Sequence, residues 1–288
     1  MSLDTTLLKD IENFQREEIT EYYIYKYLAE KEGGRNREIL LKIGEDELRH
    51  YKIWREITGK DIEPDWRKIR FYRLLYRIFG LVFSLKLMEM RERRAEERYR
   101  LIADKIEIAN DILKDEFDHE DELLSLLTDE RLQFIGSIVL GLSDALIELT
   151  GALAGLSLAL YNTLLVGLAA LITGIAASMS MAVSEYLSKR SEGDVNAVKG
   201  AFYTGLAYIL TVLFIVAPYF AGNNVYISLA SSILIASIII GGLTFYTSVV
   251  REIRWRREFI EMITLTMGVA LISFLIGYIV RITFNIEV

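Results

Sequence analysis

Histidine occurs only twice in the 288 residues, and each histidine follows a glutamate by three positions. The two motifs run from Glu47 to His50 and from Glu116 to His119. This spacing places both side chains of a motif on one face of a helix, where a carboxylate and an imidazole can bind the same metal ion. One such motif is a common accident on a helix surface, whereas two that use the only histidines of the chain indicate a metal site.

An internal repeat contains the two motifs and adds one glutamate to each half. Glu18 precedes a Tyr-Lys-Tyr-Leu-Ala-Glu-Lys segment, and Glu92 precedes the related segment Tyr-Arg-Leu-Ile-Ala-Asp-Lys. The halves align with a single gap at 32–36. Four carboxylates and two imidazoles that face inward from four helices are the ligands of dinuclear iron or manganese sites in helix bundles. The predicted ligands are Glu18, Glu47, His50, Glu92, Glu116 and His119.

Neighbouring acids compete for two of these positions. Glu17 lies beside Glu18, and Glu89 and Glu96 lie one turn to either side of Glu92. The spacing alone does not choose among them. Iron and manganese both suit carboxylate and imidazole ligands, so the metal is also left open.

The second half of the chain places acids inside long apolar segments, at Asp144, Glu148 and Glu185. A charged group inside a membrane costs about 2.5 to 3.5 kcal/mol, so intramembrane acids are functional candidates. Asp144 and Glu148 are four residues apart and share one helix face.

Two methionines, Met179 and Met181, precede Glu185. Thioether and carboxylate together suit a transiently bound divalent first-row metal ion. The alternative interpretation is that Glu185 reaches the membrane interface and that the methionines only fill space. For Asp144 this alternative is weaker, because a mid-helix acid has no interface to reach.

Five apolar runs, each long enough to cross a bilayer, follow Gln133. They lie at 134–160, 163–188, 197–220, 225–248 and 260–283. Lys and Arg precede the first run and fill the second and fourth loops, but the first and third loops contain none. Because basic residues accumulate in cytoplasmic loops, we expect five spans with the N-terminus in the cytoplasm and the C-terminus outside. A soluble protein with five core helices would need amphipathic helices, and these runs are apolar all round.

The first half has the composition of a soluble domain and contains most of the 33 Lys and Arg and of the 40 Asp and Glu. Apolar residues at helical spacing predict four helices near 4–32, 36–58, 80–105 and 106–128, with a long crossover over 59–79. The predicted fold is all-α, with a soluble four-helix bundle over 1–130 and a five-helix transmembrane bundle over 131–288. The segment 65–87 is basic and aromatic with helical spacing, and it is predicted either to lie on an anionic membrane surface or to pack on the bundle or a partner.

Composition also excludes several classes of function. Acids and bases are interleaved, and the net charge is -7, so no nucleic-acid groove is expected. The chain has no Cys, which excludes disulfides, thiolate metal sites and Cys nucleophiles. The N-terminal residues lack the pattern of a signal peptide, so we expect the first half to stay in the cytoplasm.

Two segments resemble a known transporter family. GLSDALIELTGALAG, residues 141–155, and SMAVSEYLSKRS, residues 180–191, resemble the first two helices of the vacuolar iron transporter family, whose five-helix fold moves Fe(II) or Mn(II) out of the cytosol. The resemblance implies a dimer whose pathway is lined by Asp144 and Met181, with Glu185 near the cytoplasmic entrance. Ser184 departs from the Gly that is usual in the family, and the loop SEGDVN is too short for the metal-binding insert of its plant members.

Residues 4–128 resemble the rubrerythrin and ferritin-like superfamily, which implies a dinuclear iron site at the six predicted ligands. Without Cys, the rubredoxin module of rubrerythrin is absent. Together the resemblances predict a homodimeric exporter of Fe(II), and of Mn(II) as an alternative, in the cell (inner) membrane. Transport is expected to be coupled to protons and supplied by the soluble domain. The alternatives are a membrane-anchored ferroxidase or peroxidase, and a transporter gated by the soluble domain as a sensor.

Overall fold

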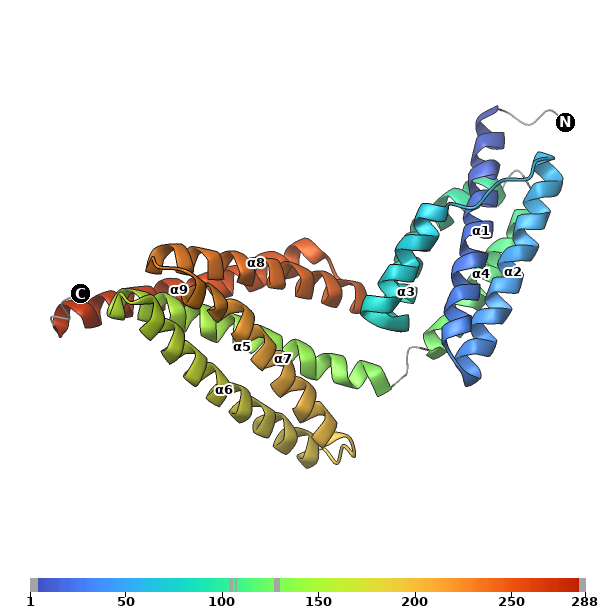
Figure 1. Ribbon diagram of the computed structural model, residues 1–288. Coiled ribbons are helices and arrows are strands. Elements are labelled where there is room, and N and C mark those ends of the chain that lie inside the picture. Colours follow the sequence, from blue (N-terminus) through green and yellow to red (C-terminus); the bar gives the residue numbers. More distant parts are fainter. Residues whose placement is uncertain (1–4, 104–105, 107, 127–129, 285–288) are drawn as a thin grey trace. The chain divides into compact units, whose positions relative to one another are not determined.

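The computed structural model describes residues 5–103, 106, 108–126 and 130–284. Within them, the side chains of 5, 6, 91–103, 117, 120, 121, 124–126 and 130–134 are not described. Helices account for all the regular structure of the described residues, which confirms the predicted all-α class (Figure 1). The chain forms two compact units, Met1–Asp129 and Glu130–Val288, and each is described by itself.

The described residues of the first unit form four helices, of which α1 packs on α2 and α3, and α4 packs on α2 and α3. Their bounds are α1 Thr5–Lys31, α2 Gly34–Thr58, α3 Trp66–Ala103 and α4 Ile108–Leu126. The end of α2 follows from Gly59, whose φ of 67° reverses the chain and whose N–H donates to the carbonyl of Arg55. Phe14 of α1 stacks on Trp54 of α2 in a small apolar core.

Most of the predicted crossover is helical, since α3 begins at Trp66. The carboxylate of Asp65 accepts hydrogen bonds from the N–H groups of Arg67 and Lys68 and so begins a helix at Trp66. Gly80, with φ 80° and ψ -173°, interrupts the helical backbone, so that α3 consists of a crossover helix and the predicted third helix. The sequence pattern already had helical spacing here, but only the cap shows where the helix begins.

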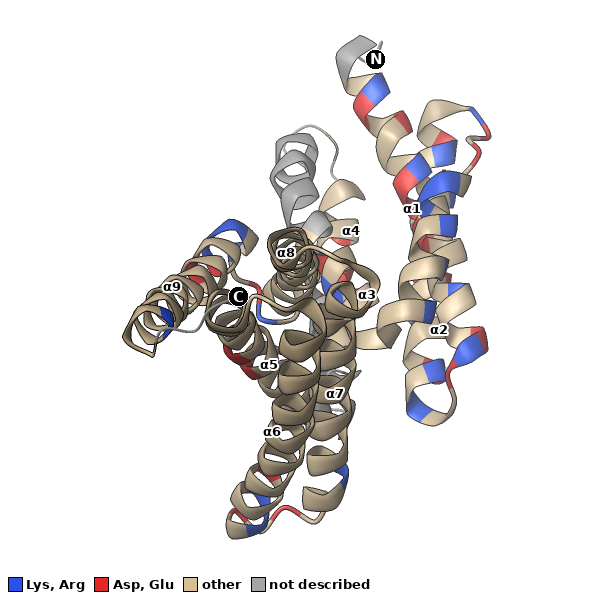
Figure 2. Cartoon of the chain, turned by 60° about the vertical axis from the view of Figure 1, so that its left-hand side comes forward, with Lys and Arg blue, Asp and Glu red and all other residues tan. Residues whose placement is uncertain are grey.

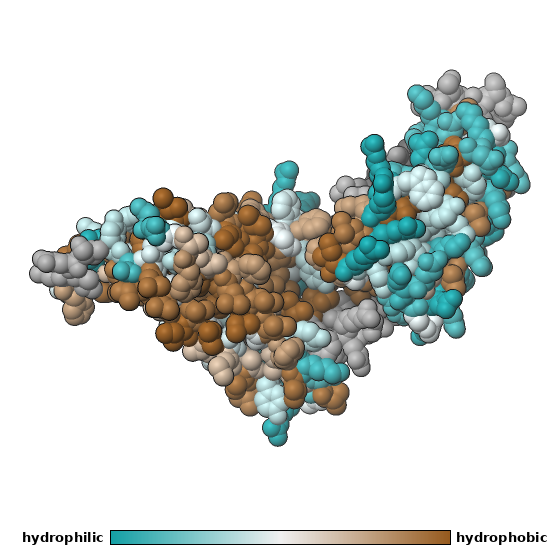
Figure 3. Space-filling view, in the orientation of Figure 1, coloured by the Kyte–Doolittle hydropathy of each residue, from teal (hydrophilic) through white to brown (hydrophobic). Residues whose placement is uncertain are grey.

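Within 130–284, the second unit has five helices that are long and apolar enough to cross a membrane, as predicted for an integral membrane protein. Their bounds are α5 Glu130–Leu160, α6 Thr163–Ser191, α7 Ala197–Ala221, α8 Val225–Val250 and α9 Trp255–Thr283. Charged residues are sparse along their lengths (Figure 2), and apolar side chains cover most of the visible surface of this unit (Figure 3).

The start of the last helix was predicted incorrectly. α9 begins at Trp255, five residues before the apolar run that starts at 260. Charged residues do not belong to an apolar run, but they can still form the first turns of its helix. The Trp255 indole donates to Thr244 of α8 and its ring packs against Phe259, which holds the first turn of α9 in place.

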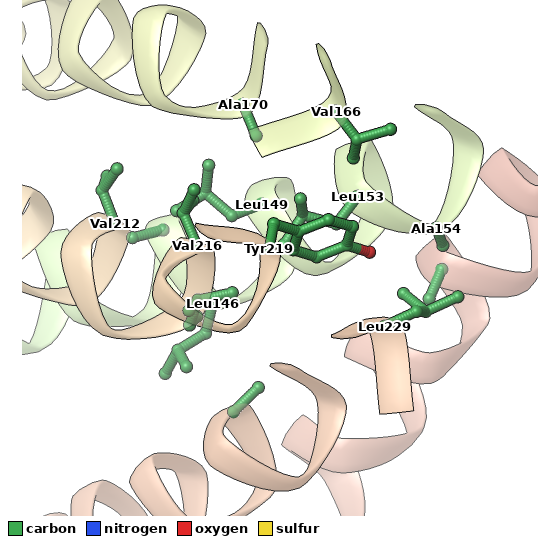
Figure 4. Close-up of a cluster of buried hydrophobic side chains, with 14 of the residues drawn as sticks. Leu146, Leu149, Leu153, Ala154, Val166, Ala170, Val212, Val216, Tyr219 and Leu229 are labelled. Carbon is green, nitrogen blue, oxygen red and sulfur yellow. The ribbon is translucent and has the colours of Figure 1, made fainter. Parts of the chain in front are cut away.

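Leu146, Leu149 and Leu153 of α5 form the centre of the membrane unit (Figure 4). They pack with Val212 and other apolar residues of α7. Tyr219 of α7 is also buried here, and its hydroxyl lies 2.6 Å from the hydroxyl of Ser157 on α5. A buried phenol is therefore satisfied without any contact to water.

Glycines set the close crossing of α5 and α9. A Cβ placed on Gly277 of α9 would lie 2.2 Å from the carbonyl oxygen of Gly155 on α5, a distance that no real Cβ contact shows. Small residues in membrane helices permit such close backbone approach. Gly151 of α5 also faces α9, since a Cβ there would lie 2.8 Å from Val269, so Gly151 and Gly155 both serve this crossing.

We expect Gly277→Ala to destabilise the membrane unit by about 1 to 3 kcal/mol, the usual cost of overpacking. Gly268→Ala on the same helix is the matched control, because a Cβ there meets nothing within 4 Å. The control should be neutral or gain up to about 1 kcal/mol from its helix propensity. Thermal unfolding of the purified protein in detergent measures both, and equal melting temperatures would contradict the proposed crossing.

Candidate metal centre and intramembrane carboxylates

Four of the predicted ligands meet inside the first unit. Glu18 comes from α1, Glu47 and His50 from α2, and Glu116 from α4, and one ligand atom of each lies within 4.8 Å of the others. Glu18, Glu47 and His50 are at most 2% exposed. The Glu116 side chain is 21% exposed and is the most open of the four. Such a cluster of acids and an imidazole could hold a metal ion.

The second histidine joins the cluster from α4. His119 is buried, and its Nδ1 lies 3.5 Å from a carboxylate oxygen of Glu47 and 3.8 Å from one of Glu116. The centroids of the His119 and His50 rings are 6.0 Å apart. Glu47 and Glu116 therefore lie between the two imidazoles, where a carboxylate can serve two ions.

Unpartnered atoms show that the cluster fits a metal. Nδ1 of His50, Nδ1 of His119 and Oε2 of Glu47 are buried and form no hydrogen bond. Around Nδ1 of His50, oxygens of three glutamates lie at 3.5 to 3.9 Å. Two atoms bound to one ion at about 2.1 Å lie no more than about 4.2 Å apart, so these spacings suit ligands of a common ion.

Two aspartates that the sequence analysis did not single out orient the imidazoles. Nε2 of His50 lies 3.2 Å from Asp115, and Nε2 of His119 lies 3.2 Å from Asp46, so each half of the repeat orients the histidine of the other half. Arg49 donates to both aspartates. When the Nε2–H group donates its hydrogen bond to the aspartate, Nδ1 is left to bind the metal. The sequence did contain a signal for these aspartates, because an Asp directly precedes the Glu of each Glu-x-x-His motif.

When no metal is present, bound protons offset the negative charge of the cluster. Burial and the nearby carboxylates of Glu116 and Glu18 raise the pKa of Glu47 well above its usual value. Burial opposes a charged imidazole, but the carboxylates of Glu116 and Glu18, each 3.5 Å from Nδ1, raise the pKa of His50 to about 10. A proton then occupies the place of a cation, and divalent metal must displace it on binding.

The remaining candidates of this site lie as follows. Glu18 also accepts a hydrogen bond from the buried indole of Trp54, at 3.2 Å, which holds that carboxylate in position. Glu92 lies in α3, but its side chain lies outside the described residues, as does that of Glu96. Glu89 is buried and ion-paired with Lys86 at 3.2 Å.

We expect Asp115→Asn to weaken metal binding by about 10- to 100-fold, the usual effect of losing a partner that orients a ligand. Removal of the charge loosens His50 without removing a ligand. Competition titration with Co(II) measures the affinity, and Asp118→Asn, an exposed change on the same helix, is the control. An unchanged affinity at an unchanged melting temperature would refute the positioning role of Asp115.

In the second unit, the Glu148 carboxylate accepts a hydrogen bond of 2.5 Å from the hydroxyl of Tyr208 on α7. Asp144 lies one turn earlier on α5 and is half-buried. Among the described residues, these acids and Glu185 do not come close enough together to form one ligand cluster. The contact with Tyr208 could not be read from the sequence, because it joins two helices 60 residues apart.

Glu185 of α6 contacts α5 directly and is linked to α7 through Ser137. It accepts a 2.6 Å hydrogen bond from Ser137 of α5, while Lys189 of α6 lies 3.8 Å away. The carbonyl of Ser137 in turn accepts from Thr204 of α7. Glu185 is 9% exposed, so protein encloses most of its side chain.

The two methionines differ in their surroundings. Met181 is partly buried and packs against the apolar core, whereas Met179 is 67% exposed on the outside of the unit. Of the two, only Met181 faces the interior of the unit.

Comparison with known proteins adds one finding. Residues 135–198 match the model of the VIT family. The matched segment contains all four intramembrane candidates, namely Asp144, Glu148, Met181 and Glu185. No curated protein and no solved structure matches the chain. The match and the five apolar helices support a membrane domain of the VIT type.

Proposed function

We propose that the chain exports divalent metal, Fe(II) or Mn(II), from the cytosol through the membrane unit and binds metal in the first unit. The observation that carries the proposal is the VIT family match over the segment that contains the intramembrane acids. Membrane carboxylates are costly, and a divalent cation is the substrate that would offset that cost.

The pathway in this proposal begins at Glu185 and is lined further by Met181, Asp144 and Glu148. Lys189 lies beside Glu185, so an arriving cation competes with a tethered ammonium group for the same carboxylate. Carboxylates that exchange a divalent ion for protons couple the two fluxes, so we propose proton antiport. A homodimer in the cell (inner) membrane, with the N-terminus in the cytoplasm, completes the proposal.

The first unit is proposed to be a ferritin-like domain with a dinuclear site. Glu18, Glu47, His50, Glu116 and His119 would hold the metal, and Glu92 of α3 is the proposed sixth ligand. A dinuclear iron site would supply oxidation of Fe(II) by dioxygen or peroxide. The protein side chains themselves would bind the ions, keep water from Nδ1 of both histidines, and release the protons that the metal displaces.

The short loop between α6 and α7 supports a joint role for the two units. Only residues 192–196 join these helices, so this loop has no room for a metal-binding insert. The first unit precedes the membrane unit in the same chain and contains a cluster of candidate metal ligands of its own. We therefore propose that it takes over metal collection.

Burial of the cluster favours a second candidate, a membrane-anchored ferroxidase or peroxidase. Three ligands at 2% exposure or less suit a resident metal better than an ion in rapid transit. In that case Fe(II) oxidation persists after Met181→Ala and Glu185→Gln, and the wild type moves no metal across the bilayer.

Uptake of Mn(II) into proteoliposomes separates the two functions, with a fluorescent chelator inside and a pH gradient imposed across the bilayer. If the chain is an exporter, one direction of the pH gradient should accelerate Mn(II) uptake and the opposite direction should slow it. Absence of Mn(II) and Fe(II) flux in either direction would leave only the enzyme.

A further inference from the structure

The crossover helix, the part of α3 from Trp66 to Phe79, uses one face to pack on α1 (Figure 1). Ile69 and Tyr72 on this face are fully buried. The ring of Tyr76 meets that of Tyr27 edge to face at 6.0 Å, and Lys68 pairs with Glu21 at 2.7 Å. Packing on the bundle, one of the predictions for this segment, thus accounts for this face alone.

The opposite face of the crossover helix remains exposed and is both apolar and basic. Leu74 and Ile78, one turn apart, are 54% and 61% exposed. Arg67, Arg70 and Arg77 are exposed on the same side, since a turn of 3.6 residues brings them next to the apolar pair. A helix with basic and large apolar residues together on its outer face is typical of helices that lie in the plane of a membrane surface.

Charge selects among the possible occupants of this face. Residues 66–79 contain basic residues but no Asp or Glu, although the whole chain has a net charge of -7. A second copy docked about a twofold axis would place the same arginines opposite one another, which is unfavourable. Anionic phospholipid offers both opposite charge and an apolar layer at the right depth.

We propose that the outer face of the crossover helix binds the anionic lipid surface of the membrane that contains α5 to α9. Leu74 and Ile78 enter the boundary between headgroups and acyl chains, and Arg67, Arg70 and Arg77 contact lipid phosphates. The first unit is then held at the bilayer by a second attachment besides its covalent link to α5. This inference rests on the membrane unit and holds whether or not the chain exports metal.

The absence of Cys from the chain permits a direct test with single spin labels. Full-length Leu74→Cys carrying a nitroxide is reconstituted into nanodiscs of phosphatidylcholine, with or without phosphatidylglycerol. With phosphatidylglycerol, accessibility to oxygen should rise and accessibility to a nickel chelate should fall, each by several-fold. Leu41→Cys on α2, where the native side chain is 39% exposed, is the control and should not respond to the lipid.

A charge variant tests the role of the arginines. Arg67→Gln, Arg70→Gln and Arg77→Gln combined should abolish the lipid response at position 74 while metal binding to the first unit persists. The matched control is the combination of Arg35→Gln, Arg37→Gln and Lys52→Gln, which removes three exposed basic residues from α2. This control should retain the lipid response.

Two outcomes would overturn the inference. Equal accessibility at position 74 in both kinds of nanodisc would show that anionic lipid is not bound there. Protection in detergent equal to that in anionic nanodiscs would show that protein covers the face, either a second copy or the membrane unit itself. Distance measurements between labelled copies would then identify which of these it is.

Discussion

Asp144→Asn is expected to reduce Fe(II) and Mn(II) flux at least about tenfold, since loss of about 1.4 kcal/mol of interaction with the ion already has that effect. The amide keeps the size of the side chain and removes the charge. A divalent ion gives up much of its hydration inside α5 to α9, so it needs carboxylates that replace the lost water. Flux into proteoliposomes, corrected for protein amount and orientation, measures the change.

The control for Asp144 is Glu192→Gln, an exposed acid just beyond the end of α6. This change also removes one negative charge, but outside the membrane segment. Flux should stay within about twofold of the wild type, a much smaller change than the tenfold loss expected for Asp144→Asn. Wild-type flux in Asp144→Asn would rule out the proposed pathway. Loss of flux in both variants would indicate a general effect of surface charge instead.

The second large effect is expected at Glu47, which contacts both imidazoles. Glu47→Gln should lower the metal content of the purified protein from the proposed two ions per chain to one or none, because the amide is a far poorer ligand than a carboxylate. Metal analysis by mass spectrometry measures the content. Glu45→Gln, an exposed change on the same helix, is the control and should retain the full metal content.

The same change should stabilise the metal-free protein, because Glu47 is buried beside other carboxylates. Its pKa in the folded protein lies well above the usual 4.5, so the fold favours the protonated form. That contribution to stability is complete below pH 4.5 and is lost as the pH rises through the raised pKa. Glu47→Gln lacks this loss, so its melting temperature should exceed that of the wild type near neutral pH, by about 2 to 4 °C per kcal/mol.

These two measurements must agree if the cluster is a metal site. Lower metal content with higher metal-free stability is the combination expected for a site whose charges are assembled for a cation. Full metal content in Glu47→Gln would refute the assignment. A lower melting temperature without metal would show that Glu47 serves the fold.

Transport by Glu47→Gln also separates the roles proposed for the first unit. Slower flux at low external metal that recovers at high metal indicates metal collection. Unchanged flux with loss of its regulation indicates a sensor. Unchanged flux with loss of Fe(II) oxidation indicates an enzyme that accompanies the transporter.

Much of the membrane unit could be predicted from composition. A span in a bilayer must form its backbone hydrogen bonds internally and expose apolar side chains to lipid. The five runs can therefore be recognised in the sequence without any knowledge of contacts. The prediction was wrong for the start of the last helix at Trp255, because hydropathy records where lipid begins and not where helical hydrogen bonding begins.

The crossover shows the limit of helical spacing as evidence. The sequence pattern of residues 66–79 fits both a helix packed on a bundle and a helix on a membrane surface. Contacts with α1 account for the face that contains Ile69 and Tyr72, and leave the face that contains Leu74 exposed. A helix with two apolar faces cannot be assigned to one partner from its period, because the period does not say which face meets which neighbour.

By themselves, the residues determined that two Glu-x-x-His motifs exist, that they repeat, and that apolar helices carry acids, because these are properties of spacing along single helices. Only the tertiary structure decided that Asp46 and Asp115 cross over to orient the opposite histidines, and that Tyr208 binds Glu148. These contacts join residues 60 or more positions apart. Their geometry depends on how helices pack, which no local pattern contains.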